Sequence, residues 1–223
     1  MKTNLFLIFV LLLWMYFVAV ELARADFPPN SLSYPVGAPN AARTTKAQVD
    51  GAVKLVREAY ANEMKSKIGC KLVITNAWNS SEVNAYASQG NGNCYVEFMG
   101  GFARHPKMTY GAVMDVLCHE VGHHLGGAPV YSDSRWASCE GQSDYFAQRC
   151  MKRILGSQEA MKAGLVLGEV LADFGNDPKP QYNTPDTRKA RGIYCAHPAA
   201  QCRVDTYLAG IMNVKRPACW YNP

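Results

Sequence analysis

The sequence predicts a disulfide-stabilised α+β domain, in which a small antiparallel or mixed sheet packs on two helices that carry chemically active side chains. Strand-like segments rich in β-branched and aromatic residues occupy the stretch from 71 to 104, and segments of helical periodicity follow them. Two of those helical segments carry paired polar motifs, His119–His123 in the first and Glu140–Asp144 in the second. Eight cysteines are spread over the same part of the chain.

The first 25 residues have the pattern of a secretory signal peptide. Lys2 gives a positive start, the run from Leu5 to Val20 is continuously apolar, and Ala23-Arg24-Ala25 is an A-x-A cleavage pattern before Asp26. We therefore expect residues 1–25 to be removed and the protein to be secreted, periplasmic or otherwise extracytoplasmic, with no stable membrane insertion after cleavage. The alternative is an uncleaved N-terminal membrane anchor, because the apolar run is only a little shorter than the about 20 residues that span a bilayer.

All eight cysteines follow the signal pattern, and an even number there argues for four disulfides in an oxidising compartment. They allow 105 pairings, and the sequence does not select among them. Cys70 and Cys94 each begin a strand-like segment, which favours a bridge between them. Cys118 precedes His119 but points elsewhere on a helix, which favours a disulfide over a role as metal ligand. The expected disulfide cysteines are Cys70, Cys94, Cys118, Cys139, Cys150, Cys195, Cys202 and Cys219.

The charge balance argues against nucleic acid as a partner. The formal net charge of +5 loses two positive residues and one negative residue with the signal peptide, which leaves +4. That charge is mild and dispersed along the chain, whereas nucleic-acid binding calls for a concentrated basic patch. The expected partner is a peptide or protein substrate, and the sequence leaves the oligomeric state open.

The N-terminal half of the mature chain reads as an arm, a helix and strands. Residues 26–43 are rich in proline and are expected to form an extended arm, and residues 44–223 a single domain. Residues 46–68 have helical periodicity and end at a glycine. Residues 71–78 read as a strand, and residues 82–104 as one or two further strands broken by the turn-forming run Gly90-Asn91-Gly92-Asn93.

The C-terminal half reads as mostly helical. Thr109 is a suitable N-cap for a helix over 110–125, which Gly126-Gly127 ends. Further helices are expected over 138–155, 157–174 and 201–212, and the polar, proline-containing stretch from 176 to 191 is expected to be a surface loop.

The segment V-L-C-H-E-V-G-H-H carries the motif H-E-x-x-H. His119 and His123 are four residues apart, so on a helix their side chains lie about 40° apart on one face, where a single Zn²⁺ can bind both. Glu120 lies beside them as the candidate catalytic general base. The sequence therefore predicts one zinc ion per chain.

A catalytic zinc usually has three protein ligands and leaves a fourth position to water. The extended motif HExxHxxGxxH fails here, because Pro129 stands where its third histidine is required. The alternative pattern takes the third ligand from a glutamate on a following helix and has an aspartate four residues later. Glu140 and Asp144 have that spacing, so Glu140 is the expected third ligand. Asp144 is then expected to accept the outer N–H of a ligand histidine, which fixes the tautomer.

The remaining polar candidates have weaker signals. His124 lies about 140° around the helix from His119, so we expect it to cap or pack and not to bind the metal. His105 is expected at the surface or in a hydrogen bond. His197, Arg203 and Tyr207 lie in the cysteine-rich C-terminal part and are candidates for stabilising the oxyanion of a transition state.

A family resemblance rests on the order of these segments. Asn84-Ala85-Tyr86-Ala87, a glycine-rich turn, a strand ending in Gly100-Gly101, the H-E-x-x-H helix and Glu-x-x-x-Asp resemble the gluzincin core of the CAAX prenyl endopeptidase and heat-shock membrane protease family, including minigluzincins. The likeness covers about Val83 to Leu155 and implies a zincin-like fold. It also implies that the strand at Asn84, Ala85 and Tyr86 holds substrate in extended form. Those relatives are mostly multi-spanning membrane proteins with few disulfides, so their prenylated or membrane-embedded substrates are not carried over.

The function expected from these residues is that of a secreted zinc-dependent endopeptidase with Glu120 as general base. One alternative is a cell-wall peptide hydrolase, which would use the same zinc chemistry on a cross-linking peptide. Another is a non-catalytic binding protein that keeps the zinc for stability, although a purely structural site has no use for the glutamate.

Overall fold

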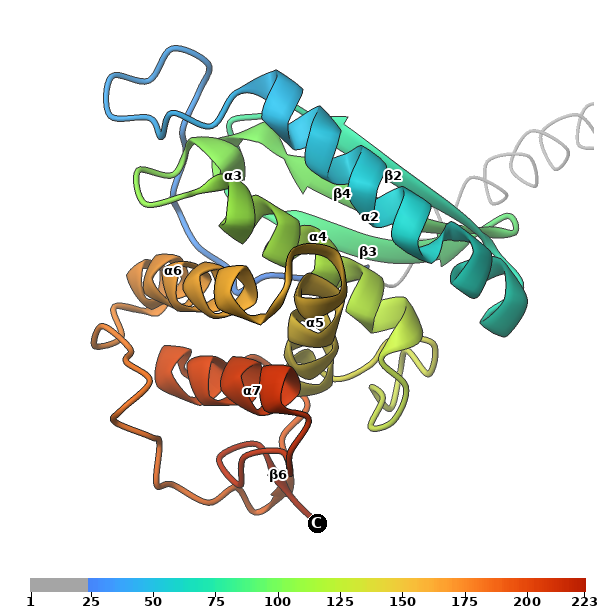
Figure 1. The fold of residues 1–223 in the computed structure, drawn as a ribbon, viewed down its shortest axis with the longest axis vertical. Helices are drawn as coiled ribbons and strands as arrows, with labels where there is room; N and C mark the ends of the chain where they lie inside the picture. Colours follow the sequence, from blue (N-terminus) through green and yellow to red (C-terminus); the bar gives the residue numbers. More distant parts are fainter. Residues whose placement is uncertain (1–23) are drawn as a thin grey trace, which may run out of the picture.

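The computed structural model describes residues 24–223. It shows a mixed sheet and a group of helices, both packed against the central helix α4 (Figure 1). On one side of α4 lie the sheet and helix α2, and on the other lie α5, α6 and α7. This arrangement confirms the predicted α+β class. The helices are α2 (Lys46–Lys67), α3 (Gly100–Arg104), α4 (Tyr110–Leu125), α5 (Glu140–Leu155), α6 (Ser157–Gly175) and α7 (Ala200–Met212).

The main sheet has four strands in the order β1-β3-β4-β2. Strand β3 pairs antiparallel with both β1 and β4, whereas β2 and β4 are parallel, so the sheet is mixed. Its buried side chains alternate along β2 and β4, as expected of a sheet with one face against a core. A second, two-stranded pairing joins β5 and β6 near the C-terminus. The strands are β1 (Arg24–Asp26), β2 (Lys71–Ala77), β3 (Ala85–Gly90), β4 (Asn93–Met99), β5 (Gly192–Ile193) and β6 (Tyr221–Asn222).

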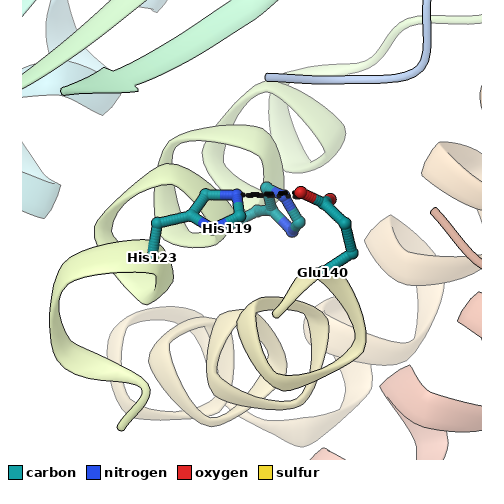
Figure 2. A group of neighbouring side chains, drawn as sticks. All are labelled: His119, His123 and Glu140. Carbon is teal, nitrogen blue, oxygen red and sulfur yellow. Dashed lines mark hydrogen bonds and ion pairs between the residues drawn. The ribbon is translucent and has the colours of Figure 1, made fainter. Parts of the chain in front are cut away.

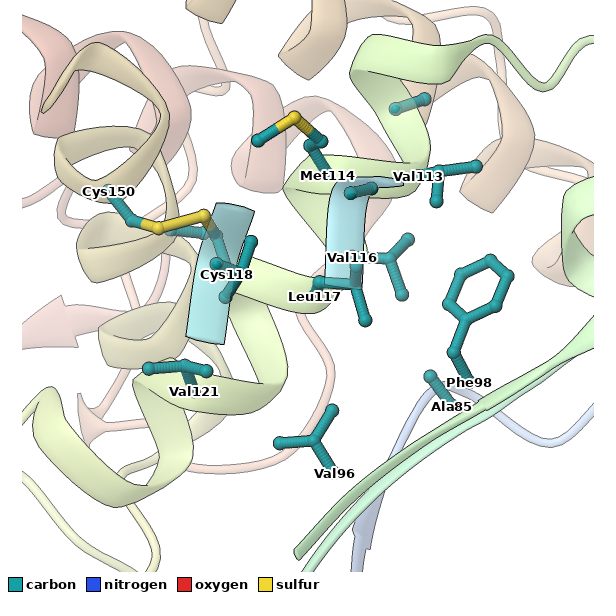
Figure 3. Packing of buried hydrophobic residues seen from close by; sticks show 14 of the residues in the cluster. Ala85, Val96, Phe98, Val113, Met114, Val116, Leu117, Cys118, Val121 and Cys150 are labelled. Carbon is teal, nitrogen blue, oxygen red and sulfur yellow. A yellow bond between two sulfur atoms is a disulfide. The ribbon is translucent and has the colours of Figure 1, made fainter. Parts of the chain in front are cut away.

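Helix α4 is buried all round from Ala112 to His124, which explains why its sequence is apolar on nearly every face. Its Val116 and Leu117 are fully buried in the cluster that also contains Val96 and Phe98 of the sheet (Figure 3). Because such cores are close-packed, the position of α4 relative to the sheet is fixed. The polar motif on α4 is thereby held inside the molecule instead of at its surface.

The helix predictions agree with the structure to within a few residues. Thr45 and Thr109 cap α2 and α4 as side-chain acceptors, and Thr45 forms a capping box with Gln48. The second motif helix begins at Glu140 and not at Ser138, because the backbone of Cys139 is not helical (ψ 154°) and the N–H of Ser138 donates to the carbonyl of His123 at the end of α4.

One local prediction was wrong, and one strand pairing was not predicted at all. The stretch from 100 to 104 is the short helix α3 and not strand, because its two glycines approach the backbone of residues 78–82 too closely for a side chain. The pairing of β5 with β6 was also missed, since two-residue strands carry no periodic signal.

Four disulfides are present, and they leave no free cysteine in the chain. The expected bridge between Cys70 and Cys94 is confirmed. Such bonds form and persist in oxidising environments. Within residues 24–223, no helix combines the length and apolarity needed to cross a membrane. The other three bridges are Cys118–Cys150, Cys139–Cys195 and Cys202–Cys219.

The predicted signal peptide lies outside the described residues except for Arg24 and Ala25, which form part of β1. The segment that follows β1 is held against the domain at several points. Phe27 is fully buried in the core, and Ser33 forms an isolated bridge with Glu82. The blue segment in Figure 1 accordingly runs along the body of the molecule.

Candidate metal centre

Helices α4 and α5 approach each other closely where the two motifs face. A Cβ atom at Gly122, inside the H-E-x-x-H motif, would lie 2.7 Å from Ser143 Oγ and 2.9 Å from the Ser143 carbonyl oxygen. Glycine therefore permits a contact that any side chain would obstruct. Ser143 uses it to donate a hydrogen bond to the carbonyl of His119. This contact brings the first two turns of α5 over the histidines of α4.

Glu140 is positioned by the start of α5 and by a disulfide. It is the first residue of the helix, its backbone N–H donates to the carbonyl of Cys195, and the Cys139–Cys195 bridge ties the same two segments together. The ring of Trp220 packs closely against Gly141, and it would lie 2.3 Å from a Cβ atom added there. The C-terminal segment thus packs directly behind the third predicted ligand.

Three predicted ligands meet in one buried cluster, shown in Figure 2. His119 Nε2 and His123 Nε2 are 3.1 Å apart. Glu140 places Oε2 3.3 Å from His119 Nε2 and Oε1 3.4 Å from His123 Nε2. All three side chains are fully buried. The group could hold a metal ion.

The spacing of the cluster fits a tetrahedral ion. Ligand atoms about 2.0–2.1 Å from a tetrahedral zinc are about 3.3–3.4 Å from one another. The three distances observed here are close to that value, and the two that involve Glu140 run to different oxygens of its carboxylate. The far side of each ring is already bonded: His119 Nδ1 is 2.9 Å from Asp144 Oδ1, and His123 Nδ1 is 2.9 Å from the carbonyl oxygen of Ser138. Those contacts direct both Nε2 atoms toward the centre, as metal-binding histidines require.

Burial and charge set the protonation of the cluster without an ion. Burial disfavours the charged form of His119, yet its bonds to Asp144 and Glu140 raise the pKa of its imidazole to about 10. Burial lowers the pKa of His123 to about 3. Burial opposes ionisation of Glu140, but the surrounding histidines lower the pKa of its carboxyl overall. Without an ion, the centre therefore holds His119 in its protonated form against the ionised Glu140, and a divalent cation that bound there would replace that proton.

Asp144 is bonded on both of its oxygens. Beyond His119, it accepts two hydrogen bonds from Arg203 on α7, at 2.7 Å to Oδ1 and 2.8 Å to Oδ2. Burial raises the pKa of Asp144, but the charges of Arg203 and His119 outweigh it and lower the pKa overall. Arg203 is itself 1% exposed, and Tyr207 is fully buried beside it. Arg203 thus supports the centre through Asp144, at 3.9 Å from Glu140 Oε2.

Glu120 lies in the same buried region, but its carboxylate differs from those of Glu140 and Asp144 in its lack of hydrogen bonds to the described chain. Neither of its carboxylate oxygens has a hydrogen-bond partner among residues 24–223. Burial raises the pKa of Glu120 well above its ordinary value, and the charges of Glu140 and Asp26 raise it further, while His119 opposes them. An unpartnered buried carboxyl is costly to a protein, which argues that its partner is a reactant or a water molecule.

Two more side chains reach Glu140, and sequence reasoning found only one of them. His197 Nε2 lies 3.4 Å from Glu140 Oε2, which brings that predicted candidate to the centre. Tyr131, which no motif marks, donates from its hydroxyl to Glu140 Oε1 at 2.9 Å. Tyr131 lies in the loop between α4 and α5. The only feature of the sequence that could have marked it as part of the centre is that it stands between the two motifs.

Other predicted residues lie away from the cluster. His124 packs, as expected: its ring stacks on Trp136 with centroids 5.0 Å apart, and its Nε2 lies 3.1 Å from the Tyr95 carbonyl oxygen. His105 is buried and not at the surface, and its hydrogen-bonded alternative is the one observed. Its Nδ1 accepts from the backbone N–H of Lys107 at 3.4 Å, and its Nε2 lies 3.4 Å from the Asp173 carboxylate.

The three residues proposed to hold substrate lie at the start of β3 or just before it. Asn84 is buried and accepts a hydrogen bond from the backbone N–H of Phe27 at 3.0 Å. Ala85 is fully buried, and Tyr86 donates its hydroxyl to Glu82. In this structure Asn84 thus holds the chain's own N-terminal segment.

Comparison of the chain with models of protein families, with curated proteins and with solved structures finds no match in any of the three. The function proposed below therefore rests on the geometry of the centre.

Proposed function

We propose that this protein is a zinc-dependent endopeptidase of the gluzincin type, with a zincin-like fold, that acts outside the cytoplasm. His119, His123 and Glu140 would hold one Zn²⁺ per chain. The observation that carries the proposal is the combination of this three-ligand cluster with Glu120, a buried carboxylate whose oxygens have no partner in the described chain. A site that only stabilised the fold would have no need of that carboxylate.

The choice of zinc follows from the donor set. Two imidazoles and one carboxylate in tetrahedral spacing form a common catalytic zinc site, whereas magnesium and calcium prefer sites made of oxygen alone. When bound, the ion supplies Lewis acidity that makes a water molecule easier to deprotonate and a carbonyl group easier to attack.

The chain's own residues supply the proton transfers and the orientation. The charge of a bound cation would favour the ionised form of Glu120. Glu120 could then take a proton from the attacking water and return it to the leaving nitrogen of the peptide bond. Asp144 holds His119 in the tautomer that directs Nε2 inward, and Arg203 keeps Asp144 ionised. His197 and Tyr131 are N–H and O–H donors at the edge of the centre, so they are placed to stabilise a developing oxyanion.

The location outside the cytoplasm is supported by the four disulfides and by the signal pattern in the sequence. Two of the bridges flank the centre: Cys118–Cys150 joins α4 to α5, and Cys139–Cys195 joins Glu140 to the segment of His197. An enzyme that works among other proteases benefits from such cross-links, because they lower the population of opened, cleavable states.

The test is metal analysis together with hydrolysis of a quenched peptide library by the parent, by Glu120→Gln and by Glu159→Gln, whose carboxylate is exposed on α6. The parent and Glu159→Gln should bind one zinc and cleave peptides. Glu120→Gln should keep the zinc and lose hydrolysis by about 10²- to 10⁴-fold or more. Zinc binding without hydrolysis by the parent would favour a binding protein, and cleavage confined to wall cross-linking peptides would favour the cell-wall alternative.

A further inference from the structure

The N-terminal strand β1 forms the edge of the main sheet next to the metal centre. It pairs antiparallel with β3, with Arg24 opposite Ser88, Ala25 opposite Ala87 and Asp26 opposite Tyr86, and it packs against α4. Without β1, the outer edge of β3 would present unpaired N–H and C=O groups beside the helix that carries His119. An edge of this kind binds extended peptides by strand addition.

The side chain of Ala25 fills a small apolar pocket. Ala25 is 6% exposed and lies in a cluster with Ala87 and Ala137, to which the rings of Tyr131 and Trp136 contribute. Methyl groups and two rings surround it, so the pocket suits a small apolar side chain. Tyr131 also donates to Glu140, and this places the pocket next to the predicted metal ligands.

The next two residues carry the chain across the centre. The carbonyl oxygen of Asp26 accepts a hydrogen bond from His197 Nε2 at 2.8 Å. The backbone N–H of Phe27 donates to Asn84, and the Phe27 ring lies 4.8 Å from the ring of His119. An extended backbone thus presents a carbonyl oxygen to a side chain that also contacts Glu140. A peptide substrate would need to do the same.

We propose that β1 occupies the groove in which this protein binds extended peptides, and that the preferred peptide has a small apolar residue where Ala25 now lies. As long as Arg24 and Ala25 are retained, the chain's own segment would compete with that peptide. This inference rests on the proposed endopeptidase function, whose substrate class it specifies. Cleavage after Ala25, as the signal pattern predicts, would remove that side chain and leave Phe27 anchored in the core.

The strength of the competition between β1 and an external peptide depends on the effective concentration of β1 at the groove. A segment tethered by a short linker acts at an effective concentration of about millimolar. It therefore excludes peptides that bind weakly, and those peptides can bind once the segment is displaced or removed. A long side chain at position 25 cannot fit between Ala87 and Ala137 and should expel β1 from the pocket. The β3 edge would then be free for an external peptide.

The experiment measures binding and not turnover. The probe is a fluorescein-labelled octapeptide that copies residues 22–29, added to full-length, zinc-loaded chains that all carry Glu120→Gln, with intact mass verifying each N-terminus. Adding Ala25→Lys should tighten binding of the probe by about tenfold or more. Adding Val36→Lys, at an exposed position of the same arm, should leave binding as in the parent.

Further arms keep each outcome decisive. Ala87→Leu added to the Ala25→Lys chain should abolish the gain, because leucine fills the pocket from β3. A probe peptide that itself carries Ala25→Lys should bind the Ala25→Lys chain about tenfold or more weakly than the unmodified probe. Equal affinity of the parent and Ala25→Lys chains, or of the two probes, would overturn the proposal. Binding that follows this pattern while no Glu120-containing chain cleaves peptides would keep the groove and reject the endopeptidase instead.

Discussion

Replacing Asp144 by asparagine tests how the centre is supported from behind. Asparagine keeps the size of the side chain and one acceptor oxygen, but its amide group must face either the N–H of His119 or the guanidinium of Arg203, and both are donors. The substitution also leaves the Arg203 charge buried, with Glu140 Oε2 3.9 Å away as a remaining counter-charge. Both metal affinity and stability should therefore fall.

The size of each loss follows from the contacts. Breaking a buried ion pair from one side costs about 3–5 kcal/mol, and the two short bonds from Arg203 to Asp144 place this pair in that class. For a chain of this length, that loss lowers Tm by about 6–20 °C. Loss of the partner of a ligand histidine weakens metal binding by about 10- to 100-fold.

Competition against a graded chelator series gives the zinc affinity, and thermal unfolding of the chelated proteins gives the stability. Asp205→Asn, a half-buried carboxylate on α7 that contacts Gln201, is the matched control and should change neither zinc release nor Tm by a comparable amount. Adding Arg203→Met to Asp144→Asn removes both charges, so the double variant should be more stable than the sum of the single losses, by about 0.5–3 kcal/mol. Equal half-release concentrations for Asp144→Asn and the parent would refute the support of the zinc ligand by Asp144.

Three further predictions concern packing, processing and pH. Gly122→Ala should destabilise the fold by about 1–3 kcal/mol in denaturant unfolding and weaken zinc binding, because its methyl group would push Ser143 away. An unchanged zinc affinity would show that zinc binding does not need the close approach of α4 and α5. The intact mass of the exported protein should correspond to Asp26 as first residue with no free thiol, and a mass that includes Met1 would favour the anchored form. Burial raises the pKa of Asp115 from 3.8 to about 8, so the folded chain holds a proton that the unfolded chain lacks, and stability should fall as pH rises through that window. Asp115→Asn should flatten that fall in urea unfolding of the chelated protein at pH 5 and pH 8, whereas an undiminished pH dependence would assign the proton to another group.

The local part of the site could be predicted from the sequence because helical geometry fixes it. His119 and His123 must share a face at a spacing of four, and Glu140 with Asp144 repeats that spacing. The structure brings the two pairs together as the motif suggested. The helix that carries the histidines was also predictable at its start, because the Thr109 cap is a local signal, whereas α5 begins after Cys139 without a side-chain cap and its start was misplaced by two residues.

The rest of the site depends on contacts between distant segments, which spacing does not encode. Arg203 reaches Asp144 from 59 residues away, and Tyr131 reaches Glu140 from a loop without a motif. Gly122 shows its role only when α5 lies across it. The pairing of Arg24–Asp26 with β3 was likewise missed, because a signal pattern and a strand end overlap there.

The most direct test of the central claim is anomalous diffraction at the zinc edge from crystals of the parent grown with zinc. We expect one strong peak per chain, about 2.0–2.2 Å from Nε2 of His119, Nε2 of His123 and a carboxylate oxygen of Glu140, with a water molecule as the fourth ligand and Glu120 beyond bonding distance. A peak held by cysteine sulfur, a peak whose ligands include Glu120 in place of Glu140, or no peak at these three residues in zinc-saturated crystals would contradict the central claim.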